Sequence, residues 1–138
     1  KVVKHHGVQF LDKKHEKLII SETNKNDVID LLGKPSTKST FDNDVWIYIE
    51  RKTSTGSIFK LGKVNLLVNN VLVLEIDEMG LLASKKFYDK KSMNDIKINT
   101  NSTDSVYKKN SFVYDFLSSM RQKINDPLGN RAKRMKDN

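Results

Sequence analysis

The sequence predicts an α+β fold in which two N-terminal helices pack on a three-stranded antiparallel sheet (ααβββ), followed by a C-terminal helix and a basic tail. Three observations lead to this prediction. Apolar residues recur at helical spacing before residue 33, β-branched and aromatic runs dominate residues 45–88, and an amphipathic helical pattern returns after residue 110.

The first predicted helix is short and covers residues 11–18. Leu11, His15 and Leu18 recur at helical spacing, with polar residues between them. Asp12 is the candidate N-cap, because its side chain can accept a hydrogen bond from a free backbone N–H group of the first turn.

The second predicted helix has the clearest end in the sequence. Thr23 or Asn24 can cap its start, and Gly33 stands where a left-handed residue commonly ends a helix. Pro35 prevents the helix from continuing. The apolar stripe of this helix consists of Val28, Leu31 and Leu32.

The strand region begins at about Asp44, where the apolar period changes. Residues 45–49 are β-branched and aromatic and predict a strand, and residues 53–57 predict a loop. Two further apolar runs, 64–68 and 71–76, are separated by Asn69-Asn70. They form either one bent strand or two short strands, and one strand kinked at the asparagines is favoured.

A tight turn is predicted at residues 77–80, because the segment begins with Asp and ends with Gly. Residues 81–88 are then the hairpin partner of the preceding strand. Ser111 is the candidate cap of the C-terminal helix. The predicted divisions are a flexible N-terminal segment (1–10), the ααβββ domain (11–90), a polar linker (91–110), an amphipathic helix (111–125) and a basic tail (126–138).

The chain has a net charge of +8, but only four of its 25 basic residues are arginines. Sequence-reading nucleic-acid domains more often use arginine forks interleaved with aromatic residues. Scattered lysines are more typical of a solvated surface, which can also lie near anionic lipid headgroups. Because there is no cysteine, disulfides and thiolate metal sites are excluded. No apolar run reaches the roughly 18 residues of a membrane span.

Catalytic and metal-binding motifs are not found, so we expect neither an enzyme nor a cofactor. The histidines, at positions 5, 6 and 15, lack a ligand spacing. Glu75, Asp77 and Glu78 are better explained by a strand and its turn than by acid/base catalysis. The sequence contains no G-x-S-x-G elbow and no glycine-rich phosphate loop.

The predicted sheet is apolar on both faces. Val45, Ile47 and Ile49 point to one side of the first strand, and Trp46 and Tyr48 point to the other. Two short helices can cover only one face. The second face must be covered by the C-terminal helix at 112–124, by a partner, or by lipid.

One set of motifs resembles a known family. The pattern runs from Thr23 through the strand residues to the hairpin turn, and consists of Thr23-x4-Val28-x3-Leu32-Gly33-x-Pro35, then Phe41, then Asp44-x-Trp46-x-Tyr48, then an apolar strand that ends in a turn with Gly80. This pattern resembles the BamE (SmpA/OmlA) family over about residues 5–90. Gly7 is similar to the family's early glycine.

The resemblance implies a non-enzymatic periplasmic lipoprotein of the outer-membrane β-barrel assembly machinery. Such a protein stabilises the association of BamA-like and BamD-like subunits and is linked to anionic phospholipid. By position, Ile47, Tyr48 and Arg51 are implied to contact a partner or lipid, whereas Trp46 is expected to pack in the core.

Three features depart from the family pattern. Glu22 replaces the usual Gly before the Thr, the chain extends well past the sheet, and the lipid-bearing cysteine is absent from these residues. Since residue 1 is Lys, we expect a processed or trimmed chain. The resemblance implies a lipid-bearing cysteine upstream of residue 1. The alternative is a secreted inhibitor-like or envelope interaction domain of the same fold that binds a soluble protein.

Overall fold

A computed structural model describes residues 2–55, 64–96 and 103–125. These described residues form five strands and three α-helices in an α+β arrangement, with two short 3-10 helices. The elements in chain order are β1 (Val2–Gly7), α1 (Leu11–Lys14), η1 (His15–Lys17), α2 (Lys25–Leu32), β2 (Thr37–Thr40), β3 (Asp44–Thr55), β4 (Val64–Ile76), β5 (Leu82–Tyr88), η3 (Ser92–Asp95) and α3 (Asp104–Asn125).

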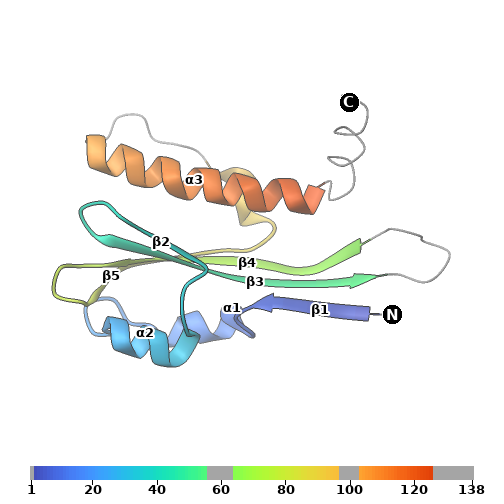
Figure 1. Ribbon diagram of the computed structural model, residues 1–138, viewed down its shortest axis with the longest axis horizontal. Coiled ribbons are helices and arrows are strands. Elements are labelled where there is room, and N and C mark those ends of the chain that lie inside the picture. The colour runs from blue at the N-terminus through green and yellow to red at the C-terminus, as the bar shows by residue number, and fades with distance from the viewer. Residues whose placement is uncertain (1, 56–63, 97–102, 126–138) are drawn as a thin grey trace.

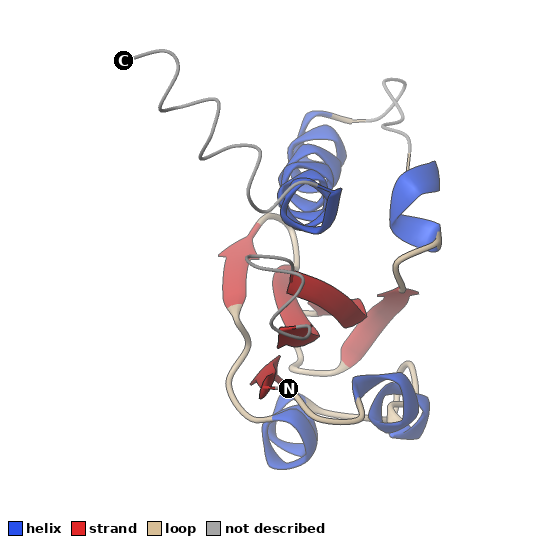
Figure 2. Cartoon of the chain, turned by 90° about the vertical axis from the view of Figure 1, so that its right-hand side faces the viewer, coloured by secondary structure: helices blue, strands red, loops and turns tan. Residues whose placement is uncertain are grey.

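The sheet lies between two helical layers. α1 and α2 cover one face, and α3 lies along the other (Figure 1). The view along the strands shows the same three layers, with the N-terminal helices and α3 on opposite sides of the strands (Figure 2). The predicted α+β class is therefore confirmed.

The sheet has five antiparallel strands rather than the three that were predicted. Its order is β1-β3-β4-β5, and β2 also pairs with β3. β1 pairs with residues 50–55 of β3, and β2 pairs with residues 44–47, so they share one edge of this long strand. α1, η1 and α2 connect them. The simple ααβββ order is thus wrong, because a strand precedes the helices and another follows them.

The N-terminal segment 1–10 was expected to be flexible, but residues 2–7 form β1. The predicted loop at 53–57 is also wrong in its first part, since residues 53–55 complete β3. Backbone pairing between β1 and β3 accounts for both differences. Residues 56 and 57 lie outside the described residues.

β4 is one continuous strand, as favoured from the sequence. Its pairing with β3 shifts where Lys52 and Thr53 lie opposite Val68 and Leu66. The extra residue of the bulge is therefore Leu67, and the predicted kink at the two asparagines is wrong. The predicted turn after β4 is confirmed, with the backbone N–H of Gly80 donating to the carbonyl of Asp77 at 3.0 Å.

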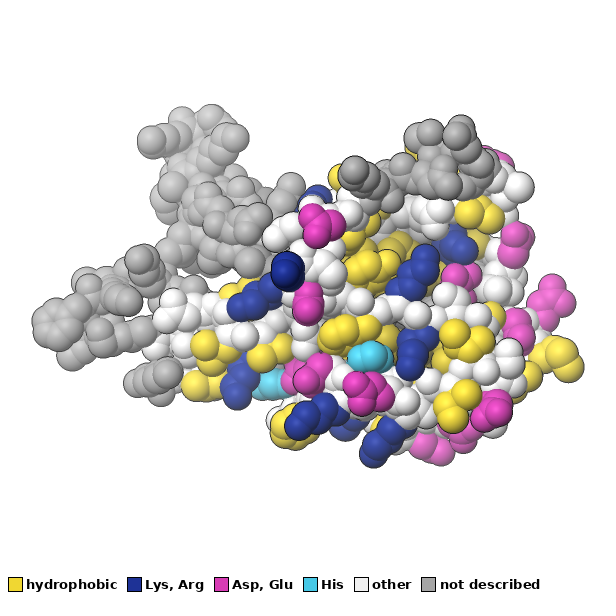
Figure 3. Space-filling model, turned by 180° about the vertical axis from the view of Figure 1, so that it is seen from behind, with side chains coloured by type: hydrophobic (Ala, Val, Ile, Leu, Met, Phe, Trp, Pro, Cys, Tyr) yellow, Lys and Arg dark blue, Asp and Glu magenta, His cyan; other side chains and the backbone are white. Residues whose placement is uncertain are grey.

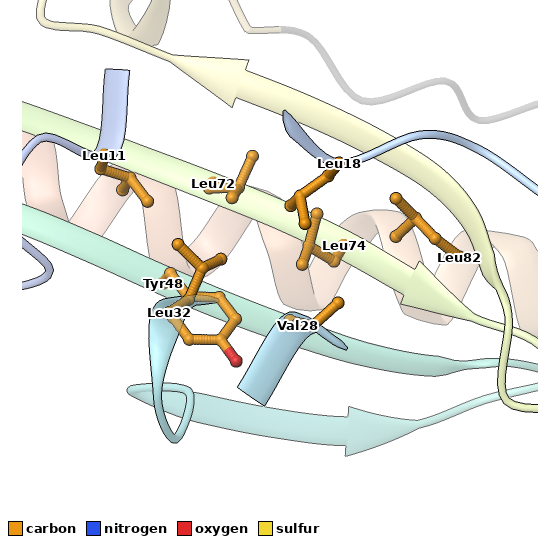
Figure 4. Packing of buried hydrophobic residues seen from close by; sticks show 8 residues of the cluster. All are labelled: Leu11, Leu18, Val28, Leu32, Tyr48, Leu72, Leu74 and Leu82. Carbon is orange, nitrogen blue, oxygen red and sulfur yellow. The ribbon is translucent and has the colours of Figure 1, made fainter. Parts of the chain in front are cut away.

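The core has two layers, one on each face of the sheet. The helix-side core joins α1, α2 and the sheet (Figure 4), and consists of Leu11, Leu18, Val28, Leu32, Tyr48, Leu72, Leu74 and Leu82. The α3-side core consists of Val45, Ile47, Val71, Val73, Met93, Leu117 and Met120. Of the three covers considered for the second face, the chain's own C-terminal helix is the one observed.

α3 begins at Asp104 rather than at the predicted cap Ser111. The sequence predicts a linker at these first turns because they are rich in polar residues and carry no continuous apolar stripe. Residues 92–95 of the predicted linker form η3, and residues 97–102 lie outside the described residues, as does the predicted basic tail. Within the described ranges, no helix is long and apolar enough to cross a membrane.

Candidate functional site

A buried carboxylate joins the N-terminal strand to the first helix. Glu50 on β3 is 6% exposed, and its side chain accepts hydrogen bonds from the backbone N–H groups of Phe10 (2.9 Å) and Leu11 (3.0 Å). His5 on β1 lies 3.1 Å from the same carboxylate. Glu50 therefore caps the start of α1 from a distant strand.

This arrangement corrects the predicted cap at Asp12. The residue before α1 is Phe10, which has a left-handed conformation (φ 58°) and no side-chain cap of its own. Glu50 supplies the acceptor instead. Sequence reasoning missed it, and the available signal was a lone carboxylate directly after the apolar run at residues 45–49.

The electrostatics of Glu50 follow from these contacts. Burial alone raises the pKa of a carboxyl group. The hydrogen bonds from His5, Phe10 and Leu11 outweigh this effect and hold the pKa of Glu50 below its usual value. The site thus favours a charged carboxylate inside the protein.

Gly7 lies where β1 leaves the sheet. Its φ is +85°, and a Cβ atom at this position would lie 2.0 Å from the backbone oxygen of Ile49. The next residue, Val8, donates its N–H to this same oxygen at 2.8 Å. Only glycine fits here without displacing β3.

The turn between η1 and α2 is held by Thr23. Its Oγ1 accepts from the N–H of Ile19 at 2.8 Å, and its carbonyl accepts from the N–H of Leu82 at 2.8 Å. Asn24 then caps α2 in a reciprocal capping box with Asp27. The positive φ of this turn falls on Ser21 (70°) and not on Glu22, the residue that departs from the family pattern.

The remaining motif residues position α2 against the sheet. Val28 and Leu32 point into the helix-side core, and Trp46 packs partly buried against it. Gly33 ends α2 with φ 79°, and Pro35 is half-buried just before β2. Gly80 (φ +80°) accepts a hydrogen bond from the N–H of Lys25 at 2.9 Å, which ties the hairpin turn to the start of α2.

Two of the three expected contact residues are buried. Ile47 and Tyr48 are both 0% exposed. Ile47 lies in the α3-side core, and Tyr48 lies in the helix-side core, where its hydroxyl donates to the carbonyl of Gly33 at 2.7 Å. In this arrangement neither side chain can touch a partner or lipid, because helices cover both faces of β3.

The Tyr48 hydrogen bond leads to a stability prediction. Tyr48→Phe keeps the ring but leaves the carbonyl of Gly33 without this donor. We expect the free energy of unfolding to fall by about 1 kcal/mol, measured by urea denaturation at pH 7. An unchanged midpoint and slope would show that the hydroxyl contributes nothing to the packing of α2.

Arg51 is the expected contact residue that keeps partial exposure. It lies on the α3 side of β3, between His6 of β1 and Asn69 of β4 in the pairing register. Burial lowers the pKa of Arg51 below its usual value. A guanidinium group can make bidentate contacts with a carboxylate or a phosphate.

The other titratable candidates have structural contacts. His15 stacks on Phe87 with ring centroids 4.3 Å apart, and burial, followed by the charge of Lys85, lowers the pKa of His15. Glu75 pairs with Lys109 at 3.1 Å, and Asp77 accepts hydrogen bonds within its turn. In the part of the chain that the structure describes, no group of three or more His, Asp or Glu residues could hold a metal ion.

Together these features define a small α+β domain whose motif residues serve packing, capping and turns. The family model described as the outer membrane protein assembly factor BamE domain matches residues 9–85, which run from the residue before Phe10 into β5. The match covers more than half of the chain, and the chain belongs to the BamE family. No curated protein matches the chain.

Membership in this family gives the broad function. The chain has the domain of an outer membrane protein assembly factor, in a periplasmic, outer-membrane-associated family whose members are not enzymes. The resemblance drawn from Thr23 to Gly80 is thereby confirmed at the level of the family.

Proposed function

We propose that this protein is a scaffold subunit of the outer-membrane β-barrel assembly machinery. In this role it stabilises the complex by contacting BamD-like and BamA-like subunits, and it contacts anionic phospholipid. The observation that carries the proposal is the family match over residues 9–85, which contains α1, α2 and the strands β2 to β4 in full.

The charge distribution at one end of the sheet supports an anionic partner. β1 pairs with residues 50–55 of β3 at this end. The charged residues of the paired segment, apart from its histidines, are Lys4, Glu50, Arg51 and Lys52. The carboxylate of Glu50 is engaged inside the protein, whereas Lys4 is exposed and Arg51 and Lys52 are partly exposed, so the exposed charge of this segment is positive. Such a surface suits acidic side chains or phosphate headgroups.

The proposal predicts that Arg51→Glu weakens capture of the assembly subunits by about tenfold, because the charge at the contact changes sign. Capture from outer-envelope extracts is quantified by immunoblot, and binding to phosphatidylglycerol vesicles is measured in parallel. Vesicles of phosphatidylcholine alone distinguish headgroup charge from general adhesion.

Lys38→Glu provides the matched control. Lys38 is exposed on β2, which pairs with the other half of the same edge of β3. Lys38→Glu therefore makes the same change of charge as Arg51→Glu, but at a distance from Arg51. We expect its capture to stay within twofold of the native chain. Equal losses for both variants would contradict a localised contact, and a collapse of the melting temperature in Arg51→Glu would identify Arg51 as structural.

Membrane attachment is part of the proposal. It would rest on a lipidated cysteine upstream of residue 1, as in the lipoproteins that the sequence resembles. The coding sequence that precedes residue 1 tests this point directly, because a signal peptide ending in a lipidation cysteine is readable there.

A further inference from the structure

The outer side of β1 is an open edge of the sheet. β1 pairs with β3 along one side only. Among the residues that the structure describes, no backbone group hydrogen-bonds to its other side. Figure 1 shows β1 at the margin of the sheet, beyond α1. Such an edge presents backbone N–H and C=O groups with which a further strand can pair.

The pairing register identifies the backbone groups that face outward. Just after β1, the N–H of Val8 donates to the carbonyl of Ile49 on β3. In an antiparallel pair, residues that exchange backbone hydrogen bonds alternate with residues that do not. The residues in step with Val8, at positions 2, 4 and 6, therefore direct their backbone groups towards β3. Val3 and His5 direct their N–H and C=O groups outward.

The opposite edge of the sheet, β5, is protected against strand addition. The N–H of Leu82 donates to Thr23 at 2.8 Å, and the carbonyl of Leu82 accepts from Ser21 at 2.7 Å. β5 also contains the pair Lys85-Lys86 and a bulge in its pairing with β4. In the view from behind, Lys and Arg side chains lie among the apolar ones on the side where β5 lies (Figure 3). Covering segments, lysines and bulges all block strand edges.

β1 lacks most of these protections and is nevertheless held in place. Its six residues contain one lysine, and its pairing with β3 has no bulge. Val2 is 56% exposed and Val3 is 48% exposed. The strand is fixed by the contact of His5 with Glu50 at 3.1 Å and by the close approach at Gly7. A strand that is already ordered can receive another strand without the entropic cost of ordering itself.

The charge of β1 indicates which kind of strand fits. Lys4 and His6 lie on the same face of the sheet as Arg51, and residues 2–7 contain no acidic residue. A second copy of β1 fits poorly. The antiparallel registers with the most pairs place the lysine of one copy opposite the lysine or a histidine of the other, and like charges directly opposite are destabilising. An acidic strand matches this face instead.

We propose that the outer edge of β1 binds an extended segment of a partner protein, which adds to the sheet as an antiparallel strand and alternates apolar with acidic residues. The apolar residues lie opposite Val3 and His5 and exchange backbone hydrogen bonds with them. The acidic residues lie between them, opposite Lys4 and His6. That this segment belongs to an assembly subunit rests on the proposed function; the strand addition itself does not.

The test titrates the full chain with a labelled synthetic peptide of four Val-Glu repeats and measures binding by fluorescence anisotropy. N-methylation of the valines removes the donors that face β1, so the affinity should fall by about tenfold or more. N-methylation of the glutamates blocks only the far edge of the peptide. This second peptide has the same side chains, and its affinity should stay within about twofold of the unmodified peptide.

Two substitutions in β1 test the site from the side of the protein. Val3→Pro removes an outward N–H group, and proline is tolerated on an edge strand where the N–H faces solvent. We expect binding to be lost while the melting temperature changes by only a few degrees. Lys4→Glu should reject the Val-Glu peptide and bind one of four Val-Lys repeats. Lys86→Glu, at an exposed position of β5, is the matched control and should keep native affinity.

The proposal is overturned if the native chain does not bind the peptide at millimolar concentration, or if both N-methylated peptides bind equally well. It is also overturned if Lys4→Glu and Lys86→Glu have equal effects. Sedimentation that shows a dimer dispersed by Val3→Pro would identify a second copy as the occupant and would contradict it as well. None of these measurements involves the assembly subunits, so failure of subunit capture would count against the proposed function without deciding strand addition at β1.

Discussion

Gly7→Ala should lower the free energy of unfolding by about 3–5 kcal/mol, one of the largest losses available from a single methyl group in this protein. The added Cβ would lie 2.0 Å from the backbone oxygen of Ile49, and a backbone atom in mid-sheet cannot turn aside as a side chain could. β1 would have to leave β3, and the hydrogen bond from Val8 to Ile49 would be lost with it.

Gly80→Ala is the matched control for this prediction. Gly80 has nearly the same φ (+80°), but a Cβ there meets nothing nearer than 3.9 Å, in the flexible side chain of Lys25. Its cost should be the left-handed backbone strain alone, about 1–2 kcal/mol. Urea denaturation of both variants separates strain from collision. Equal losses would show that β1 yields easily and that Gly7 is not required for close approach.

Glu50→Gln should destabilise the protein by about 2–3 kcal/mol at pH 7, although the two side chains have nearly the same shape. The carboxylate accepts from the N–H groups of both Phe10 and Leu11. The amide of Gln has one accepting oxygen and one donating nitrogen, so one of these N–H groups would face another donor.

Because of the Glu50 carboxylate, we expect part of the free energy of unfolding to be lost at acidic pH. Because the pKa of Glu50 is lower in the folded state than its usual 4.5, the unfolded chain takes up the proton first as the pH falls. The stabilisation is thus complete above pH 4.5 and is lost as the pH falls through the folded-state pKa. The difference between the native chain and Glu50→Gln should shrink over this range.

Glu16→Gln is the control for the acid profile, since Glu16 is an exposed carboxylate of η1 close in sequence to the capped helix. Its stability difference from the native chain should stay within about 0.5 kcal/mol at neutral and acidic pH. A Glu50→Gln difference that is constant across the acid range would contradict a charged carboxylate at the cap.

The parts of the fold that sequence predicted correctly are those with a strong local pattern. The end of α2 at Gly33, the strand at residues 45–49 and the turn at 77–80 each depend on residues close together in the chain. β1 and β2 were missed because they are short edge strands with mostly polar side chains. Their pairing with β3 is a long-range property that no local period reveals.

The candidate site could likewise be predicted only where it depends on residues close together in the chain. Because side chains alternate between the two faces of a strand, Ile47 and Tyr48 were predicted to lie on opposite faces of β3. Their places in the two core layers confirm this prediction. Whether those faces are exposed depends on helices far away in the sequence, and both residues are buried. The cap formed by Glu50 on Phe10 and Leu11 joins residues about 40 positions apart, so local capping rules pointed to Asp12 instead.

The most direct test of the proposed scaffold role is affinity capture of the native chain from outer-envelope extract in mild detergent. Its partners are identified by mass spectrometry, and Arg51→Glu serves as the control with a weakened contact. The account predicts that BamA-like and BamD-like subunits co-purify with the native chain and are recovered about tenfold less with the control. Recovery of neither subunit by a chain that shows native circular dichroism and cooperative unfolding would contradict it.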